Sequence, residues 1–322
     1  MYDIVALGEI LIDFAPEGMN DNHVQLFSCN PGGAPANVLA MVAKLGGKTA
    51  FIGKVGKDSF GQLLIDTLSK NRIDYSGVVQ DPRYHTTLGF VQLDHKGDRS
   101  FSFYRDPGAD LMLTNEEVPN RLLQQCSIFH FGSLSMTDEP CRSATLEAAQ
   151  TARSKGAIIT YDPNYRDPLW ESEAKAKEYI LNAMPLANIL KVSEEEMLLL
   201  TGKTDLEIGA EELSKLGPSI IFVTLGSKGS FCYTKKFSLL VPAYKVCTVD
   251  TTGAGDAFFG ALLWQLKGKT LEEICEMQRK DWEETLSFAN AAGGLTTQVK
   301  GAMPAMPDFD AIMTCVHSGN IF

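Results

Sequence analysis

The chain has 322 residues, of which 44% are hydrophobic and 21% are charged, and its net charge is −11. This composition is ordinary for a globular protein with a sizeable core and excludes a disordered chain. The acidic balance disfavours a protein that coats nucleic acid, and no apolar stretch reaches the roughly 18 residues that a membrane span needs. The seven cysteines include no CxxC pair, so we expect reduced thiols and no structural zinc site.

The segment from Met1 to Phe14 lacks the basic start of a signal peptide, and Glu9 and Asp13 interrupt its apolar run. We therefore predict a first strand there and a cytoplasmic protein. Along the rest of the chain, short apolar runs predict strands and apolar residues at helical spacing predict helices. The predicted strands cover residues 2–7, 49–53, 127–131, 157–161, 189–192 and 220–224. The predicted helices cover residues 34–45, 60–68, 139–154, 172–183, 194–200 and 257–266. This alternation predicts an α/β fold, with a parallel sheet covered by helices on both faces.

Two stretches interrupt the alternation. Residues 14–29 have no helical period, and residues 86–104 alternate in places around the turn signal Lys96-Gly97-Asp98. We predict antiparallel strands in both, forming a small excursion that could cover a site on the main sheet and exclude water. A plain surface hairpin is the alternative.

The most informative segment is VDTTGAGDAFFGALLW, residues 249–264. Gly253, Ala254 and Gly255 are small and precede a strong helix pattern. Backbone N–H groups at such a helix start can bind an anion, and the helix dipole adds to the attraction. Asp256 in the first turn is either a helix-capping residue or a base that takes a proton from an attacking hydroxyl beside an anion hole.

Two common nucleotide-binding motifs fail in this chain. Three Gly-Lys-Thr triplets resemble the end of a P-loop, but the glycine required earlier is replaced by Val42, Met197 or Leu263. A dinucleotide fingerprint also fails, because Phe258 stands where the third glycine belongs. The chain is therefore predicted to be neither a P-loop NTPase nor a dinucleotide-binding protein.

A second glycine motif is CNPGGAPAN, residues 29–37. Gly32 and Gly33 precede a helix pattern, and Asn37 lies one turn into it. A glycine pair can bring the backbone against a ligand, and an asparagine amide offers both a donor and an acceptor to a hydroxyl. Taken alone, this segment would be a turn followed by a helix.

Together, GGAPAN and the later DTTGAGDAFFGA, residues 250–261, resemble the two signatures of the ribokinase-like (PfkB) carbohydrate kinase family. The resemblance extends over nearly the whole chain. It implies one doubly wound α/β domain over residues 1–322, with a β-sheet lid formed from residues 14–29 and 86–106. It also implies an ATP-dependent sugar kinase that uses Mg²⁺ and, in many members, K⁺.

The resemblance further implies roles for individual residues. Asp256 would be the catalytic base, with Gly253, Ala254 and Gly255 as its anion hole. The sugar would be bound by Asp13, Gly32, Gly33 and Asn37. The nucleotide would lie near Thr224, Gly226 and Gly229 of the segment VTLGSKG, and Asn290 would lie near the adenine. Asp250 and Thr252 would belong to a monovalent-cation loop. Without the resemblance, VTLGSKG would be a strand with a hairpin turn, and the segment around Asn290 a tightly packed helix.

One motif departs from the family pattern. Members commonly carry Asn-x-x-Glu in a turn that helps to hold magnesium and phosphate, whereas this chain has Ser193-Glu194-Glu195-Glu196. Glu196 keeps the acidic position and is expected to act on Mg²⁺ through water, with Lys191 and Ser193 near the nucleotide. Few protein ligands are expected, because Mg²⁺ binds mainly through substrate phosphates and water.

The segments FYRDPGAD, DPNYRDPLW and LKVSEEE resemble those of fructokinase-type members. Arg105 would reach the sugar from the lid. Asn164 and Arg166 follow a core strand, where α/β sheets present their ligands, although Arg166 has a structural ion pair as its alternative. We expect conversion of D-fructose to fructose 6-phosphate. Ribose, 2-keto-3-deoxygluconate, another hexose or an inactive sugar-binding paralogue are the alternatives. Lid strands could also pair edge to edge in a homodimer, and no nucleic-acid or membrane partner is expected.

Overall fold

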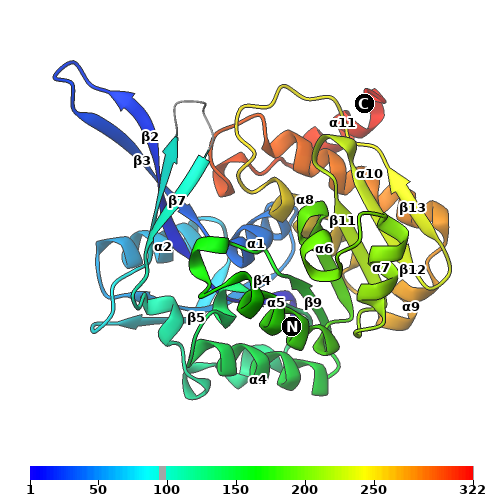
Figure 1. Ribbon diagram of the computed structural model, residues 1–322, viewed down its shortest axis with the longest axis horizontal. Helices are drawn as coiled ribbons and strands as arrows, with labels where there is room; N and C mark the ends of the chain where they lie inside the picture. The colour runs from blue at the N-terminus through cyan, green and yellow to red at the C-terminus, as the bar shows by residue number, and fades with distance from the viewer. Residues whose placement is uncertain (94–98, 322) are drawn as a thin grey trace.

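A computed structural model describes residues 1–93 and 99–321 of the chain (Figure 1). Its larger sheet has the strand order β13-β12-β11-β10-β9-β8-β1-β4-β5. The strands are β1 (Tyr2–Leu7), β4 (Thr49–Gly56), β5 (Asp74–Asp81), β8 (Cys126–Gly132), β9 (Ile158–Asp162), β10 (Ile189–Ser193), β11 (Ile220–Thr224), β12 (Ser230–Thr234) and β13 (Ser238–Val241). All neighbours from β5 to β11 pair in parallel, and β12 and β13 add an antiparallel edge.

The order of the strands reverses at β1. The chain builds β4 and β5 on one side of β1 and then returns to build β8 and its successors on the other side. In an open α/β sheet, such a reversal leaves a crevice outside the carboxyl ends of the strands, where ligands bind. The predicted doubly wound α/β fold is therefore confirmed, and its switch point lies beside β1.

Helices cover both faces of the larger sheet. They are α1 (Ala34–Lys44), α2 (Ser59–Lys70), α3 (Asn120–Leu123), α4 (Cys141–Ser154), α5 (Glu173–Ala183), α6 (Glu194–Thr201), α7 (Leu206–Ser214), α8 (Ala254–Leu266), α9 (Leu271–Glu276), α10 (Arg279–Thr296) and α11 (Phe309–Ser318). Side chains alternate between the faces of a strand, so β1 serves two cores. Ile4 and Ala6 pack with α1, α8 and α10, whereas Val5 and Leu7 pack with α4.

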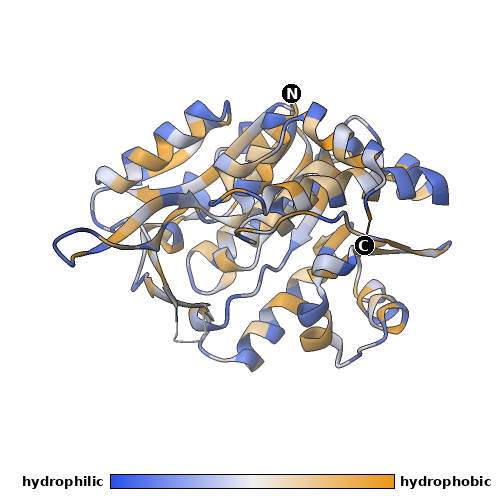
Figure 2. Cartoon of the chain, turned by 90° about the horizontal axis from the view of Figure 1, so that it is seen from above, coloured by the Kyte–Doolittle hydropathy of each residue, from blue (hydrophilic) through white to orange (hydrophobic). Residues whose placement is uncertain are grey.

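The smaller sheet has the order β3-β2-β6-β7 and consists of β2 (Leu11–Met19), β3 (Gln25–Gly32), β6 (Leu88–Leu93) and β7 (Arg99–Tyr104). The pairs β2–β3 and β6–β7 are antiparallel, as predicted, but β2 pairs with β6 in parallel. The two hairpins thus join through their first strands. The hairpin of β2 and β3 projects from the body of the molecule and ends in a hydrophilic tip (Figures 1 and 2). The predicted turn Lys96-Gly97-Asp98 lies outside the described residues.

The predicted strands and helices of the main body are all present, with ends shifted by up to three residues. The sequence patterns missed several elements, among them the edge strands β5 and β13, whose partly exposed faces weaken the apolar signal. The helix predicted from residue 257 begins at Ala254 instead, which makes Asp256 the third residue of α8. Among the described residues, no helix has the length and apolarity that crossing a bilayer requires.

Candidate active site

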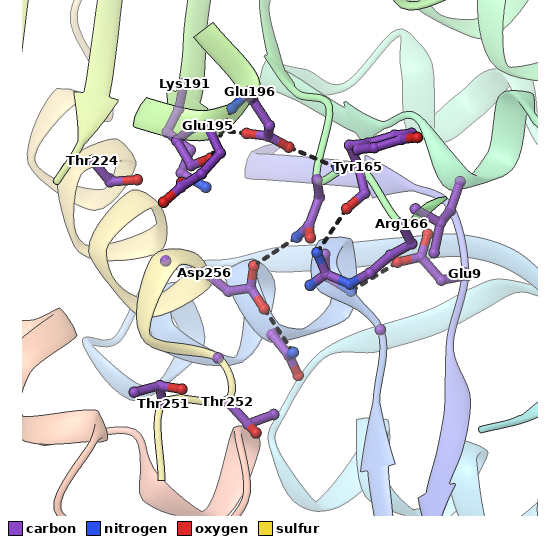
Figure 3. A pocket seen from close by; sticks show the side chains of 18 of the residues that line it. Glu9, Tyr165, Arg166, Lys191, Glu195, Glu196, Thr224, Thr251, Thr252 and Asp256 are labelled. Carbon is purple, nitrogen blue, oxygen red and sulfur yellow. Dashed lines mark hydrogen bonds between the residues drawn. The ribbon is translucent and has the colours of Figure 1, made fainter. Parts of the chain in front are cut away.

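A cavity of about 710 Å³ opens at the carboxyl ends of the parallel strands, beside the smaller sheet (Figure 3). Its walls come from β2, the start of α1, the segments that follow β9 and β10, and the start of α8. Predicted site residues in its lining are Asp13, Gly33, Asn37, Asn164, Arg166, Lys191, Ser193, Glu196, Thr224, Thr252, Gly253, Gly255 and Asp256. Folding thus gathers most of the predicted residues into one cavity.

Asp256 is buried between two amides at the start of α8. Its Oδ2 accepts a hydrogen bond of 2.8 Å from Asn37 Nδ2, and its Oδ1 accepts one of 3.2 Å from Asn164 Nδ2. Burial raises the pKa of Asp256, although these hydrogen bonds and the charges of Lys191 and Arg166 oppose the rise. Each oxygen keeps a second lone pair, so the carboxylate is oriented and still able to accept a proton.

The start of α8 depends on two glycines. Gly253 adopts the left-handed conformation, with φ at 77°, and a Cβ atom there would lie 2.6 Å from the Cβ of Ala302. A Cβ on Gly255 would lie 3.2 Å from Lys191 Nζ. The first N–H groups of a helix have no partner within the helix. Because Gly255 has no side chain, this helix start and the Lys191 ammonium lie close together.

Lys191 is paired with Asp162, since its Nζ lies 2.9 Å from Asp162 Oδ2 and both side chains are buried. Burial alone would lower the pKa of Lys191, but the charges of Asp162, Glu196 and Asp256 outweigh it and raise the pKa. The lysine is therefore a cation at neutral pH. The other oxygen of Asp162 accepts a hydrogen bond of 3.1 Å from the backbone N–H of Asn164.

Glu196 joins the segment after β9 to the start of α6 in the wall of the cavity. Its two oxygens accept hydrogen bonds of 2.7 Å from the backbone N–H groups of Tyr165 and Ser193. The hydroxyl of Ser193 in turn accepts from Glu196 N, which completes a capping box at the start of α6. Glu196 thus fixes the segment after β9 relative to α6, and its role toward Mg²⁺ stays a prediction.

Asp13, on β2, also lines the cavity. A Cβ on Gly32 or on Gly89 would lie 2.7 Å or 2.6 Å from its carboxylate oxygens, so both glycines leave it room. Burial raises the pKa of Asp13 to about 6, and the charge of Arg166 opposes the rise. Gly33 has φ at 118°, and a Cβ there would lie 2.4 Å from the carbonyl oxygen of Glu9.

One cavity therefore contains the buried Asp256 carboxylate at the start of a helix and the Asp13 carboxylate, whose pKa burial raises to about 6. In a comparison with known protein families, residues 1–308 match the model described as pfkB family carbohydrate kinase. The chain belongs to the pfkB family of carbohydrate kinases.

The relatives of this pfkB kinase include fructokinases. It is 44% identical over 319 residues to "Fructokinase-1" of Oryza sativa subsp. japonica, and the aligned residues make up 98% of each chain. The crystal structure of fructokinase with bound ATP from Xylella fastidiosa is 31% identical, with a TM-score of 0.92 over 99% of both chains. A fructokinase double mutant from Vibrio cholerae O395, in a form with bound fructose, ADP and potassium ion, is 32% identical. It has a TM-score of 0.86 over 97% of this chain and 98% of that one.

Arg105, which the resemblance assigns to the sugar, lies beside a second cavity in this pfkB kinase. Arg105 is absent from the lining of the main cavity and borders a second cavity of about 480 Å³. Its Nη2 lies 2.6 Å from Asp110 Oδ2, to which Nε donates at 2.8 Å. Its Nη1 donates to Thr137 Oγ1, and Nη2 also donates to the Leu134 carbonyl oxygen. The guanidinium group therefore makes a buried ion pair with Asp110, and its expected contact with the sugar stays a prediction.

Other predicted nucleotide residues have structural contacts in this pfkB kinase. A Cβ on Gly229 would lie 2.0 Å from the carbonyl oxygen of Val241, so this glycine is required by the turn into β12. The amide of Asn290 donates to the carbonyl oxygens of Val241 and Pro242. Gly226, Gly229 and Asn290 do not line the main cavity, whereas Thr224 does.

The predicted cation loop lies at the edge of the site. Asp250 Oδ1 accepts hydrogen bonds from the backbone and the hydroxyl of Thr252, and its Oδ2 accepts from Gly301 N. Asp250, Thr252 and Gly32 border a neighbouring cavity of about 240 Å³ between the smaller sheet and this loop. Within the described residues, no group of three His, Cys, Asp or Glu side chains is arranged to hold a metal ion.

Sequence reasoning missed Asp162 and Glu9. Asp162 ends the strand β9, and the rule that drew attention to Asn164 and Arg166 applied equally to it. Glu9 lines the cavity, where its Oε1 accepts from Ala34 N at the start of α1. Burial raises the pKa of Glu9 to about 7. Its only sequence signal was a charge directly after an apolar strand.

Proposed function

We propose that this pfkB kinase transfers the γ-phosphoryl group of ATP to the 6-hydroxyl of D-fructose, which yields D-fructose 6-phosphate and ADP. The position of Asp256 carries the proposal, because a buried and oriented carboxylate lies directly at a helix start suited to an anion. The choice of fructose is supported by the fructokinases among the relatives.

The proposed step needs one base and one site for negative charge. The oxygen of the sugar hydroxyl forms a bond to the γ-phosphorus, and its proton passes to the Asp256 carboxylate. The bond from the γ-phosphorus to the bridging oxygen breaks, and its electron pair stays on ADP. The turn of Gly253, Ala254 and Gly255 holds the charge of the phosphoryl group during transfer, with the N–H of Gly255 as a donor, since the N–H of Ala254 donates to the Thr251 carbonyl oxygen at 3.2 Å. Asp13, Gly33 and Asn37 bind the sugar, and Arg166 borders it.

ATP is the proposed phosphoryl donor, with Mg²⁺ bound to its phosphates. Bound Mg²⁺ would neutralise charge on the β- and γ-phosphate oxygens. The described residues fit this role, because the carboxylate of Glu196 lines the cavity. The loop of Asp250 and Thr252 is the proposed K⁺ site, which is in line with the potassium-bound relative.

The test is ADP release from ATP and Mg²⁺, with and without K⁺, in the presence of single sugars. The panel is fructose, ribose, glucose, mannose and 2-keto-3-deoxygluconate. We expect strong turnover with fructose. Turnover with a different sugar would overturn the proposed substrate and keep the kinase chemistry, whereas binding of sugar without turnover would favour an inactive sugar-binding paralogue.

We also propose a homodimer that forms through the smaller sheet. Exposed apolar side chains gather on its strands, including Met19, Phe27 and Tyr104. Phe90 contacts both Phe27 and Tyr104, so the apolar surface crosses the sheet. A sheet with open edges and an apolar face favours pairing with a second copy. Sedimentation of the wild-type protein should give twice the monomer mass, and Phe27→Lys should return it to the monomer.

A further inference from the structure

Lys191 differs from an ordinary buried lysine in how its donors are used. Lys54 is also buried, and its ammonium group contacts the Met112 carbonyl oxygen, the Glu117 carboxylate and Asp81 Oδ2 within 3.0 Å. All three of its N–H groups therefore have partners. Lys191 has one partner among the described residues, Asp162, although its side chain is only 7% exposed.

The unused donors of Lys191 lie next to the proposed anion hole. Its Nζ is 3.2 Å from where a Cβ on Gly255 would be, and Lys191 and Asp256 enter the same cavity from different elements (Figure 3). Within the described part of the chain, Arg166 and Lys191 are the only basic side chains in the lining, which is otherwise rich in carboxylates. A phosphoryl group at this place needs a cation, and a buried ammonium with free donors can supply it.

Asp162 connects this cation to the base. Its Oδ2 holds Lys191 Nζ at 2.9 Å, and its Oδ1 accepts from Asn164 N at 3.1 Å. The side chain of Asn164 then donates to Asp256 Oδ1 at 3.2 Å. Asn164 has φ at 47°, a left-handed conformation that asparagine tolerates and that the hydrogen bond from its backbone N–H to Asp162 stabilises. One buried carboxylate therefore orients both the ammonium group and the residue that holds Asp256.

We propose that Lys191 is a catalytic residue that donates hydrogen bonds to the phosphoryl group during its transfer, and that Asp162 is a positioning residue that holds Lys191 and Asn164 in place. This inference rests on the proposed kinase function. Lys191 changes no covalent bond, and its proton stays on the ammonium group. Its contribution is to hold charge that grows on the phosphoryl oxygens in the transition state, so its loss should lower kcat more than it raises KM.

Four variants test the proposal. Lys191→Met removes the cation but leaves Asp162 buried without its partner, which can impair folding. The double variant Lys191→Met with Asp162→Asn removes both charges and keeps an oxygen for the N–H of Asn164. Asp162→Asn alone keeps this oxygen and places an amide N–H₂ beside the ammonium, which displaces Lys191. Lys54→Met is the matched control, since it breaks a buried lysine network outside the cavity.

The measurements are kcat, KM for MgATP and for the sugar, melting temperature, and binding of MgADP with aluminium fluoride, a mimic of the phosphoryl group in transfer. We expect kcat of the double variant to fall about 100-fold, the size of effect seen when one such charge-stabilising donor is removed. Both KM values and the affinity for MgADP alone should stay within about threefold, while the aluminium fluoride complex weakens in step with kcat.

Asp162→Asn alone should lower kcat less than the double variant does. Combined with Lys191→Met it should cause no further loss of kcat, because both substitutions act through the Lys191 ammonium group. Lys54→Met should lower the melting temperature without this change in kcat.

A folded double variant whose kcat lies within fivefold of the wild type would overturn the proposal. A rise in KM for MgATP at unchanged kcat would also overturn it, because Lys191 would then bind ATP equally in the ground and transition states. All variants are compared with the sugar that the wild type turns over. Failure of the fructose assignment is therefore visible in the wild type alone, before any variant is measured.

Discussion

Asn37 and Asp256 are 219 residues apart in the chain, yet Asn37 Nδ2 donates a hydrogen bond of 2.8 Å to Asp256 Oδ2. The bond joins the first turns of α1 and α8, which pack so closely that a Cβ on Gly260 would lie 2.6 Å from the Val38 carbonyl oxygen. The two glycine motifs of the sequence therefore meet at this hydrogen bond between an amide and a carboxylate.

Asp256→Asn should remove the base and leave the fold intact. The amide has the same shape as the carboxylate but cannot take up the proton of the attacking hydroxyl. Loss of a general base typically costs about 10² to 10⁴ in rate, so we expect kcat to fall within this range. Steady-state kinetics and circular dichroism of the variant test this expectation. Near-normal turnover by a folded variant would remove Asp256 from the proposed mechanism.

Asn37→Ala should shift the pH dependence of the reaction. Asp256 must be ionised to act as a base, so kcat/KM falls as the pH drops through the pKa of Asp256. The hydrogen bond from Asn37 opposes the rise of this pKa, and its removal should raise the pKa further. The acidic limb of the pH profile should therefore move to higher pH. A limb that stays in place would show that another group controls it.

Asp13→Asn should weaken sugar binding and raise the stability of the fold at neutral pH. The pKa of Asp13 is about 6 in the folded protein, above its unfolded value, so the folded state favours the protonated form. Ionisation of Asp13 therefore costs stability as the pH rises from about 4 to 6. At pH 7.5 the neutral variant should melt at a higher temperature than the wild type, and its KM for the sugar should be raised. At pH 4 the two melting temperatures should converge, and a gap that persists there would contradict the role of ionisation.

Arg105→Met should reduce stability rather than weaken sugar binding. The substitution leaves Asp110 buried without its cation, and breaking a buried pair in this way costs about 3–5 kcal/mol. Urea unfolding at neutral pH measures this loss, and KM for the sugar is measured at a temperature where the variant is folded. A large rise in KM at unchanged stability would return Arg105 to the sugar site that the sequence suggested.

Local sequence patterns predicted much of the fold and several residues of the site. Alternating strands and helices, the helix start at Gly253-Ala254-Gly255 and the acid that follows it are readable because each depends on a few neighbouring residues. The two motifs, GGAPAN and DTTGAGDAFFGA, already predicted the family and the α/β fold. In both cases backbone geometry demands particular residue types, such as glycine where φ is positive or where another atom lies close.

Side-chain partners depended on the folded chain. The resemblance assigned Arg105 to the sugar, and sequence reasoning gave Asp162 no role. Folding gives Arg105 a buried partner in Asp110 and turns Asp162 toward Lys191 and Asn164. The parallel pairing of β2 with β6 was likewise open until both hairpins were placed on the main body. Partners and burial are set by which strand ends and helix starts meet in space, and residues distant in the chain decide that.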